Sequence, residues 1–146
     1  MIDDIDRSIL QLLAGNARMS LKELAAQISL SSPATSERLR RLEERGVIRA
    51  YTVDIDPRLL GHGVQAIVRI RPLPGRLQLV QKLIEATAEV VECDKVTGDD
   101  CFVARLFVRS MEHLDEVVNR IAEEATTNTS IVKGQLIQRR PPPIIT

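Results

Sequence analysis

The stretch SLKELAAQISLSSPATSERLRRLEERG, residues 20–46, contains two helical patterns on either side of a serine-rich break. The first pattern opens with Ser20 and Glu23 in the S-x-x-E form of a capping box, which satisfies backbone N–H groups at a helix start. The apolar residues that follow recur at helical spacing and predict one buried stripe. They are Leu21, Leu24, Ala25 and Ile28. The stretch therefore begins with a short amphipathic helix.

The second pattern predicts a longer helix that begins at Pro33, because a residue without an N–H is well tolerated at the first helical position. Ser31 or Ser32 is the natural cap, and Gly46 ends the helix after about Arg45. The two helices are joined by roughly three residues, which is the helix-turn-helix arrangement that enters the major groove of DNA.

A further helix precedes this pair, since apolar residues at helical spacing follow the acidic stretch DDID, and carboxylates favour the first turn of a helix. Its buried stripe is Ile5, Ile9, Leu12 and Leu13. After Gly46 comes VIRAYTVDIDP, whose β-branched residues and closing Pro57 predict an extended strand or ribbon. The N-terminal part is therefore expected to be a helix-turn-helix domain of winged-helix-like type.

The character of the pattern changes near residue 60. Four strand-like and two helix-like stretches follow, in the order β-α-β-β-α-β. They are VQAIVRIR (64–71), RLQLVQKLIEATA (76–88), EVVECDKV (89–96), CFVARLFV (101–108), SMEHLDEVVNRIAEEA (110–125) and TSIVKGQLIQ (129–138). This order is the ferredoxin-like plan, so the whole chain is of the α+β class. An apolar sheet face left bare by the helices would need a partner sheet, which makes homodimerisation a natural expectation.

Composition narrows the classes of function. The chain carries 20 basic and 20 acidic side chains, so DNA binding must rest on a local patch and not on overall charge. Aromatic residues make up 2% of the chain, which argues against stacking platforms for RNA or single strands. The acidic start MIDDIDRSIL is unlike a signal peptide and no apolar run is long enough to span a membrane, so we expect a cytoplasmic protein without a membrane partner.

The helix after Ser32 carries the residues expected to contact DNA. At about 100° per residue, Thr35, Leu39 and Leu42 share the side that packs inward. Arginine pairs with guanine edges, glutamate with cytosine amino groups, and serine with base edges or phosphate, while capping serines and free N–H groups suit a phosphate. The DNA-binding candidates are Ser31, Ser32, Pro33, Ser36, Glu37, Arg38, Arg40, Arg41 and Arg49.

Two alternatives stay open within this set. The charged run RLRRLEERG, taken alone, also suits a solvated surface helix, and only its place after a capped helix and a short turn favours DNA. Arg38 falls between the inward and exposed sides of the helix. An ion pair with an acid of the first helix fits that position as well as a phosphate contact does.

The stretch TGDDCF, residues 97–102, joins two of the predicted strands. Glycine and aspartate are ordinary turn residues. A metal site is disfavoured, because His62 and His113 are isolated in the sequence and are not expected to converge with Cys93 and Cys101. A catalytic pair of carboxylates would need a base or nucleophile that the sequence does not indicate. We therefore expect no metal, no cofactor and no enzymatic activity.

Residue types and spacing across the N-terminal half form a specific pattern. It consists of Asp3 and Asp6 before Ile9-Leu10, Asn16-Ala17-Arg18, Glu23-Leu24-Ala25, Ser31, Arg38, Leu42, Gly46-Val47-Ile48, Tyr51 and Gly61. This pattern closely resembles the Lrp/AsnC family of bacterial and archaeal transcription regulators, and the β-α-β-β-α-β order is similar to that family's ligand-sensing and assembly domain. The resemblance covers nearly the whole chain.

The resemblance implies homodimers formed through the C-terminal sheets, further association into tetramers, octamers or similar rings, and an amino acid or similar small effector bound where dimers meet. It also implies an effector site at the turn after the second strand and at the threonines near the last strand. The implied residues are Gly98, Asp99, Asp100, Cys101, Thr127 and Thr129. Asp100 replaces the aromatic residue and Cys101 the second acid of the family's usual Gly-Asp-Tyr-Asp-like turn.

These expectations divide the chain into a helix-turn-helix domain (1–46), a strand or linker (47–61), a βαββαβ domain for effector binding and oligomerisation (62–140) and a tail (141–146). The leading hypothesis is a sequence-specific regulator that binds double-stranded DNA and is modulated by a small effector through its assembly. The alternatives are an architectural nucleoid protein without effector and, on weaker grounds, an enzyme like the tetrapyrrole decarboxylases that share this two-domain plan.

Overall fold

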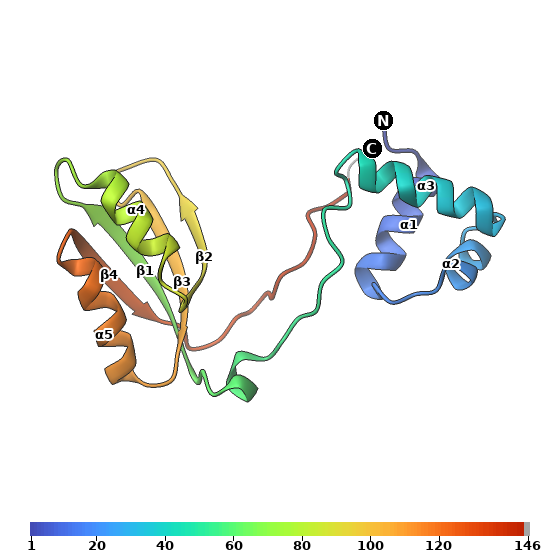
Figure 1. The fold of residues 1–146 in the computed structure, drawn as a ribbon. Coiled ribbons are helices and arrows are strands. Elements are labelled where there is room, and N and C mark those ends of the chain that lie inside the picture. The colour runs from blue at the N-terminus through green and yellow to red at the C-terminus, as the bar shows by residue number, and fades with distance from the viewer. Residues whose placement is uncertain (145–146) are drawn as a thin grey trace. The chain divides into compact units, whose positions relative to one another are not determined.

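The computed structural model describes residues 1–144, which form two compact units. Met1–Asp54 and the C-terminal residues from Ile137 onward belong to one unit, the helical unit, and Ile55–Leu136 form the other, the sheet unit. Figure 1 shows helices alone in the first unit and a sheet with two helices in the second. The predicted domain boundaries at residues 46, 61 and 140 remain sequence-based predictions.

The helical unit contains α1 (Asp4–Gly15), α2 (Leu21–Gln27) and α3 (Ser32–Glu44). Side chains cap each helix start. Ser20 and Glu23 form the predicted capping box at α2, and Asp3 forms a second one with Asp6 at α1. Ser31, and not Ser32, caps α3, because its hydroxyl accepts the backbone N–H of Ala34 at 3.3 Å. The helix-turn-helix prediction is confirmed.

The core of the helical unit lies where the three helices meet. Ile9 of α1, Leu24 of α2 and Leu42 of α3 are fully buried there and are surrounded by partly buried apolar side chains. Ser29, in the turn between α2 and α3, adopts a positive φ of 55° that L-residues seldom take. The backbone therefore changes direction at Ser29, between the end of α2 and the start of α3.

The segment that follows α3 was predicted as an extended strand, ribbon or linker. Residues 49–56 form no strand, since within the part of the chain that the structure describes no ladder of backbone hydrogen bonds includes them. β-branched residues favour an extended chain, but a strand also needs a neighbour to pair with. The 3-10 helix η1 (Pro57–Leu60) follows and ends at Gly61, whose φ of 86° suits glycine.

The sheet unit contains the predicted β-α-β-β-α-β order. Its elements are β1 (Val64–Pro72), α4 (Leu77–Glu85), β2 (Val90–Lys95), β3 (Phe102–Val108), α5 (Met111–Ala122) and β4 (Ala125–Ile131). The strands lie in the order β2-β3-β1-β4 and every neighbouring pair is antiparallel. Both helices cover the same face of the sheet (Figure 1). The α+β, ferredoxin-like prediction is confirmed.

The last strand was misplaced by the sequence patterns, which put it at residues 129–138. β4 instead covers the polar run ATTNTSI and pairs with β1 from Pro72↔Ala125 to Ala66↔Ile131. A strand at the sheet edge needs few apolar side chains, and threonine has a high strand propensity. Pairing with β1 therefore sets the position of β4, and apolar content does not.

The two faces of the sheet differ in composition. On the helix-covered face a continuous core is formed by the alternate residues of β1 and β3 with side chains of α4 and α5. On the open face Ile67, Val103 and Phe107 are half-buried, beside the charged side chains of Arg69 and Arg105. The open face is thus partly apolar and partly charged, and an apolar partner sheet would cover only part of it.

Candidate functional site

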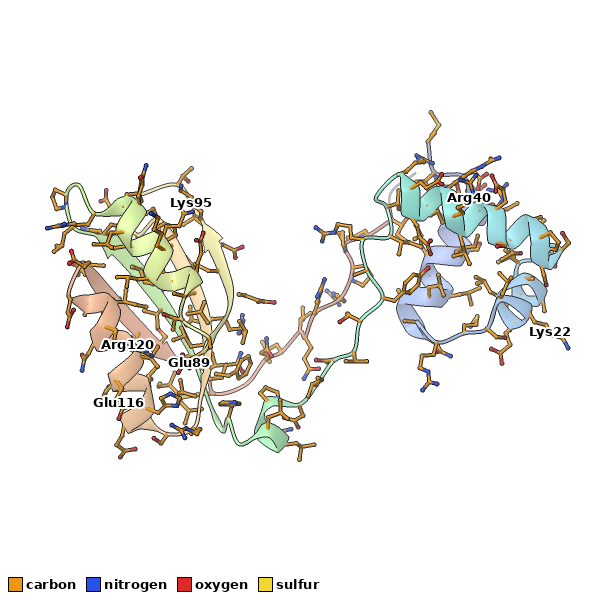
Figure 2. All side chains as sticks on the ribbon, viewed as in Figure 1. Lys22, Arg40, Glu89, Lys95, Glu116 and Arg120 are labelled. Atoms are coloured by element: carbon orange, nitrogen blue, oxygen red, sulfur yellow. The ribbon has the colours of Figure 1, made fainter. Side chains whose placement is uncertain are left out.

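Except for Arg38, the predicted DNA-binding residues of α3 lie on its exposed or half-exposed side. Ser31, Ser32, Pro33 and Ser36 are exposed in the first turns, whereas Thr35 is buried and donates its hydroxyl to the carbonyl of Ser31 at 2.9 Å. Further along α3, the side chains of Arg40 and Arg41 are also exposed, and Figure 2 labels Arg40. The helix start is therefore fixed by buried contacts while its hydroxyls remain open to solvent.

Glu37 holds the arginines of this side in a network. Arg40 makes a forked pair with Glu37, with Nη2 2.8 Å from Oε1 and Nε 3.0 Å from Oε2, and also pairs with Glu44. Arg41 Nε lies 3.0 Å from the same Oε1 of Glu37. Hydrogen bonds from Arg40 and then Arg41 lower the pKa of Glu37 to about 2. Glu37 is therefore charged at neutral pH and neutralises part of the exposed side.

Arg38 lies on the side of α3 that faces α1. Its Nη1 is 2.7 Å from Asp3 Oδ2 and 2.8 Å from Asp6 Oδ1, and Asp6 is buried. The hydrogen bond from the Asp6 N–H, followed by that from Arg38, lowers the pKa of the Asp3 carboxyl. The structure thus shows the ion pair with the first helix, and Arg38 joins α3 to the start of α1.

Two residues beyond α3 are exposed. Arg49, which was predicted to contact the DNA backbone, is one of them. Tyr51 donates its hydroxyl to Glu43 Oε1 at 2.8 Å, and burial together with this carboxylate raises the pKa of Tyr51 to about 12. The sequence analysis gave Tyr51 no role. The contact ties the irregular segment after α3 back to the helix.

The predicted effector turn is a tight hairpin between β2 and β3. The N–H of Val96 donates to the carbonyl of Cys101 at 2.8 Å, and Gly98 has a φ of 102°, which few other residues adopt. Arg71, at the end of β1, reaches both acids of the turn, with 3.1 Å to Asp100 Oδ1 and 3.7 Å to Asp99 Oδ2. These ion pairs place a cation beside two carboxylates at one end of the strands.

Sequence reasoning missed Arg71, although strand alternation would have placed it on the face opposite the core. It also assigned Thr127 and Thr129 to the hairpin site, although the two threonines lie on the other face of the sheet from Arg71. Thr127 is opposite Ile70 and Thr129 is opposite Val68, so both threonines lie on the helix-covered face. Thr126 is opposite Arg71 and shares its open face. Thr127 therefore lies near the hairpin end of β1 and Thr129 at the middle of β1, and neither is on the face of Arg71.

The two histidines were not expected to converge with the cysteines on a metal. His62 and His113 line one pocket of about 640 Å³ in the sheet unit. The two cysteines are free thiols, and Cys101 packs against the apolar core. Among residues 1–144 no group of three or more histidine, cysteine, aspartate or glutamate side chains is arranged to hold a metal ion.

Comparison with known proteins agrees with this architecture. A family model described as winged helix-turn-helix DNA-binding matches residues 2–49, and one described as Lrp/AsnC ligand binding domain matches residues 65–142. The transcriptional regulator LrpA of Mycobacterium tuberculosis is 37% identical over 129 residues, covering 88% of this chain and 86% of that protein.

Solved structures give the same result. The structure of LrpC from Bacillus subtilis has a TM-score of 0.89 at 27% identity, with 95% of this chain and 99% of that chain covered. The feast or famine regulatory protein of M. tuberculosis, complexed with L-methionine, has a TM-score of 0.87 at 34% identity, with 97% and 100% covered. Within the described residues, no helix is long and apolar enough to cross a membrane. The chain belongs to the Lrp/AsnC family of DNA-binding transcriptional regulators.

Proposed function

We propose that the chain binds specific double-stranded DNA through the exposed side of α3, and that an amino acid or similar small effector modulates this binding by changing the protein's assembly. The observation that carries the proposal is the arrangement of α3 in a family helix-turn-helix unit. The buried residues Thr35 and Leu42 fix its orientation, and Ser36 and Arg40 are left exposed one turn apart.

The network around Glu37 supports a role in specificity. Arg40 gives up a forked carboxylate when it pairs with a guanine, so only a base edge that offers two good acceptors replaces what is lost. Glu37, once released, accepts a hydrogen bond from a cytosine amino group.

Selection of bound sequences from a random duplex pool, with the purified full chain at one fixed salt concentration, tests the proposal. We expect an enriched motif, and we expect Arg40→Ala combined with Ser36→Ala to weaken binding to it by about 10- to 100-fold. Arg58→Ala is the matched control, because Arg58 is an exposed arginine of the sheet unit that also pairs with a carboxylate. A pool without an enriched motif would support the architectural alternative instead.

The effector site that we propose consists of Gly98, Asp99, Asp100 and Cys101 of the hairpin, together with Thr127 and Thr129 of β4. The L-methionine complex of a 34% identical relative supports an amino acid as effector. An acid of the hairpin pairs with the ammonium group, and Arg71, a threonine hydroxyl or a backbone N–H receives the carboxylate. Because Arg71 already bridges the acids, it is in place to exchange one carboxylate for that of the ligand.

Calorimetric titration with single amino acids tests this site. Asp100→Asn is expected to weaken the binding of the effector about tenfold, because a charge-assisted hydrogen bond to the ammonium group is lost. Asp94→Asn is the control, since Asp94 lies outside the hairpin in β2. Equal weakening by the two substitutions, or by neither, would exclude the hairpin as the site.

The assembly that we propose is a homodimer through the open sheet faces, which associates further into tetramers, octamers or similar rings, with dimer contacts completing the effector site. The half-buried Ile67 and Phe107 on the open face support the dimer. We also propose that the protein acts without catalysis and in the cytoplasm, where its DNA target lies. Sedimentation with and without the effector measures the assembly, and a monomer at all concentrations would contradict it.

A further inference from the structure

A segment near the end of the chain belongs to the helical unit, although it follows the sheet unit in sequence. Ile137 and the residues after it group with the helices, whereas β4 and the chain up to Leu136 group with the sheet. The stretch IQRRPPPI, residues 137–144, is called the arm here, and its backbone forms neither helix nor strand. Neither the DNA-binding side of α3 nor the hairpin site includes the arm.

The arm carries the net positive side-chain charge of the helical unit. Residues 1–54 contain basic and acidic side chains in equal number, and Arg40 and Arg41 of α3 pair with Glu37. The arm adds Arg139 and Arg140 and contains no acidic residue. A unit that binds DNA needs a local excess of cations near the phosphates. These two arginines supply that excess.

Both arginines of the arm are accessible to a ligand. Arg139 and Arg140 are exposed, and within residues 1–144 no aspartate or glutamate carboxylate lies at ion-pair distance from either guanidinium. Glu124 is the last acidic residue of the sequence, so the approach to the arm along the chain carries no repelling carboxylate. A phosphate that reaches the arm therefore meets two guanidinium groups without displacing an acid, in contrast to Arg40.

Three prolines stiffen the arm directly after the arginines. Proline fixes its own φ and has no N–H, so the exposed run Pro141–Pro143 favours an extended polyproline conformation and cannot complete a strand ladder. The residue before a proline is also restricted to extended backbone, and here that residue is Arg140. Ile144, after the prolines, is half-buried. The arm thus loses little conformational freedom when it binds.

We propose that the arm is a second DNA-binding element, in which Arg139 and Arg140 contact backbone phosphates of the duplex that α3 reads. This inference rests on the proposed DNA-binding function. A guanidinium pairs with phosphate oxygens through charge and two parallel hydrogen bonds, whatever the base sequence. The arm therefore adds affinity, and α3 selects the sequence. A protein that recognises proline-rich segments is the other class of partner, and the unpaired charges of the arm favour DNA over it.

Arg139→Gln combined with Arg140→Gln in the full chain tests the proposal. The affinity is measured over a series of salt concentrations for two duplexes, one with the motif enriched by selection and one of unrelated sequence. We expect binding of both duplexes to weaken by the same factor, about tenfold at low salt, because phosphate contacts do not depend on sequence. The slope of log affinity against log salt should become less steep by about 1 or more.

Two comparison variants separate the arm from overall charge and from base reading. Lys82→Gln combined with Lys133→Gln removes the same charge from two exposed residues of the sheet unit, and it should bind both duplexes as the wild-type chain does. Arg40→Ala combined with Ser36→Ala should show the opposite pattern to the arm variant, with the larger loss for the motif duplex. Sedimentation of the arm variant should give the wild-type dimer fraction.

Three results would overturn the inference while the proposed function stands. The first is an arm variant with the affinity and salt slope of the lysine control, which would leave the arm to a protein that recognises proline-rich segments. The second is a loss confined to the motif duplex, because the arm would then read bases. The third is a changed dimer fraction, because the arm would then act through assembly. A wild-type chain that binds neither duplex would instead contradict the proposed function itself, and the inference with it.

Discussion

The helical unit and the sheet unit are stabilised in different ways. The buried apolar cluster of the helical unit consists of Ile9, Leu24 and Leu42, whereas that of the sheet unit runs along β1, β3, α4 and α5. The helical unit adds side-chain caps at all three helix starts and the Arg38 ion pairs between α1 and α3. A small apolar core therefore makes the DNA-binding unit dependent on polar contacts, and we expect it to unfold first.

The largest effect is expected for Leu42→Ala, which removes one of the three buried residues of the small core. Truncating a buried leucine costs about 3 kcal/mol, so the helical unit should unfold at lower denaturant concentration and DNA binding should be lost. Circular dichroism during denaturation measures this. Leu106→Ala is the counterpart in the sheet unit, and it should leave the transition of the helical unit in place. A single joint transition in both variants would show that the units are not independent.

A smaller effect is expected for Asp6→Asn, which removes a carboxylate that is mostly buried and pairs with Arg38 at 2.8 Å. A hydrogen bond to a charged partner contributes about 2 kcal/mol, and the helical unit should lose that amount of unfolding free energy. Asp4→Asn is the control, because Asp4 lies in the same helical turn with a side chain that is 94% exposed. If the two variants were equally stable, the Arg38 ion pairs would not be holding the helices together.

Ser31→Ala should destabilise the helical unit by about 1 kcal/mol, because it removes the cap of α3. Ser32→Ala is the control for stability, since Ser32 does not cap the helix. Chemical denaturation measures both, and DNA binding at a temperature where both variants are folded separates the cap from a phosphate contact. A larger stability loss in Ser32→Ala would mean that the cap is assigned to the wrong serine.

The smallest effect is the acid sensitivity of the helical unit. The pKa of Asp3 is lowered in the folded state, so the ionised form stabilises the fold fully above the ordinary value of 3.8. That contribution is lost as the pH falls through the lower, folded-state pKa. We expect the melting temperature of the helical unit to decrease as the pH is lowered below 3.8. In Asp3→Asn the melting temperature should depend less steeply on pH. An unchanged slope in the variant would assign the acid sensitivity to other carboxylates.

Features that depend on residues close together in the chain could be predicted from the sequence. Features that depend on contacts between distant segments could not. The capping box of Ser20 and Glu23 and the helix end at Gly46 depend on neighbours along the chain, and both were predicted correctly. The segment after Gly46 was predicted as an extended strand or ribbon from its residue types, and residues 49–56 join no strand ladder within the described chain. Strand formation, however, depends on a partner elsewhere in the chain or in another copy, which residue types do not reveal.

The candidate sites show the same limit. The exposed residues of α3 follow from helical periodicity alone, so they could be named in advance. The approach of Arg71 to Asp100 depends on the register of β1 with β3 and on the length of the hairpin. The placement of His62 and His113 in the lining of one pocket depends on where η1 lies at the end of the sheet. Neither arrangement is encoded by spacing along the chain.

The division of α3 between buried and exposed positions has an evolutionary consequence. Thr35 and Leu42 are buried, while Ser36 and Arg40 are exposed and contribute nothing to the core. Under the proposed DNA contact, substitutions at the exposed positions are expected to change the preferred base sequence while the buried positions keep the fold. After gene duplication, one copy could acquire a new set of target promoters by a few substitutions on this side of one helix, while its assembly and its response to small molecules stayed as they were.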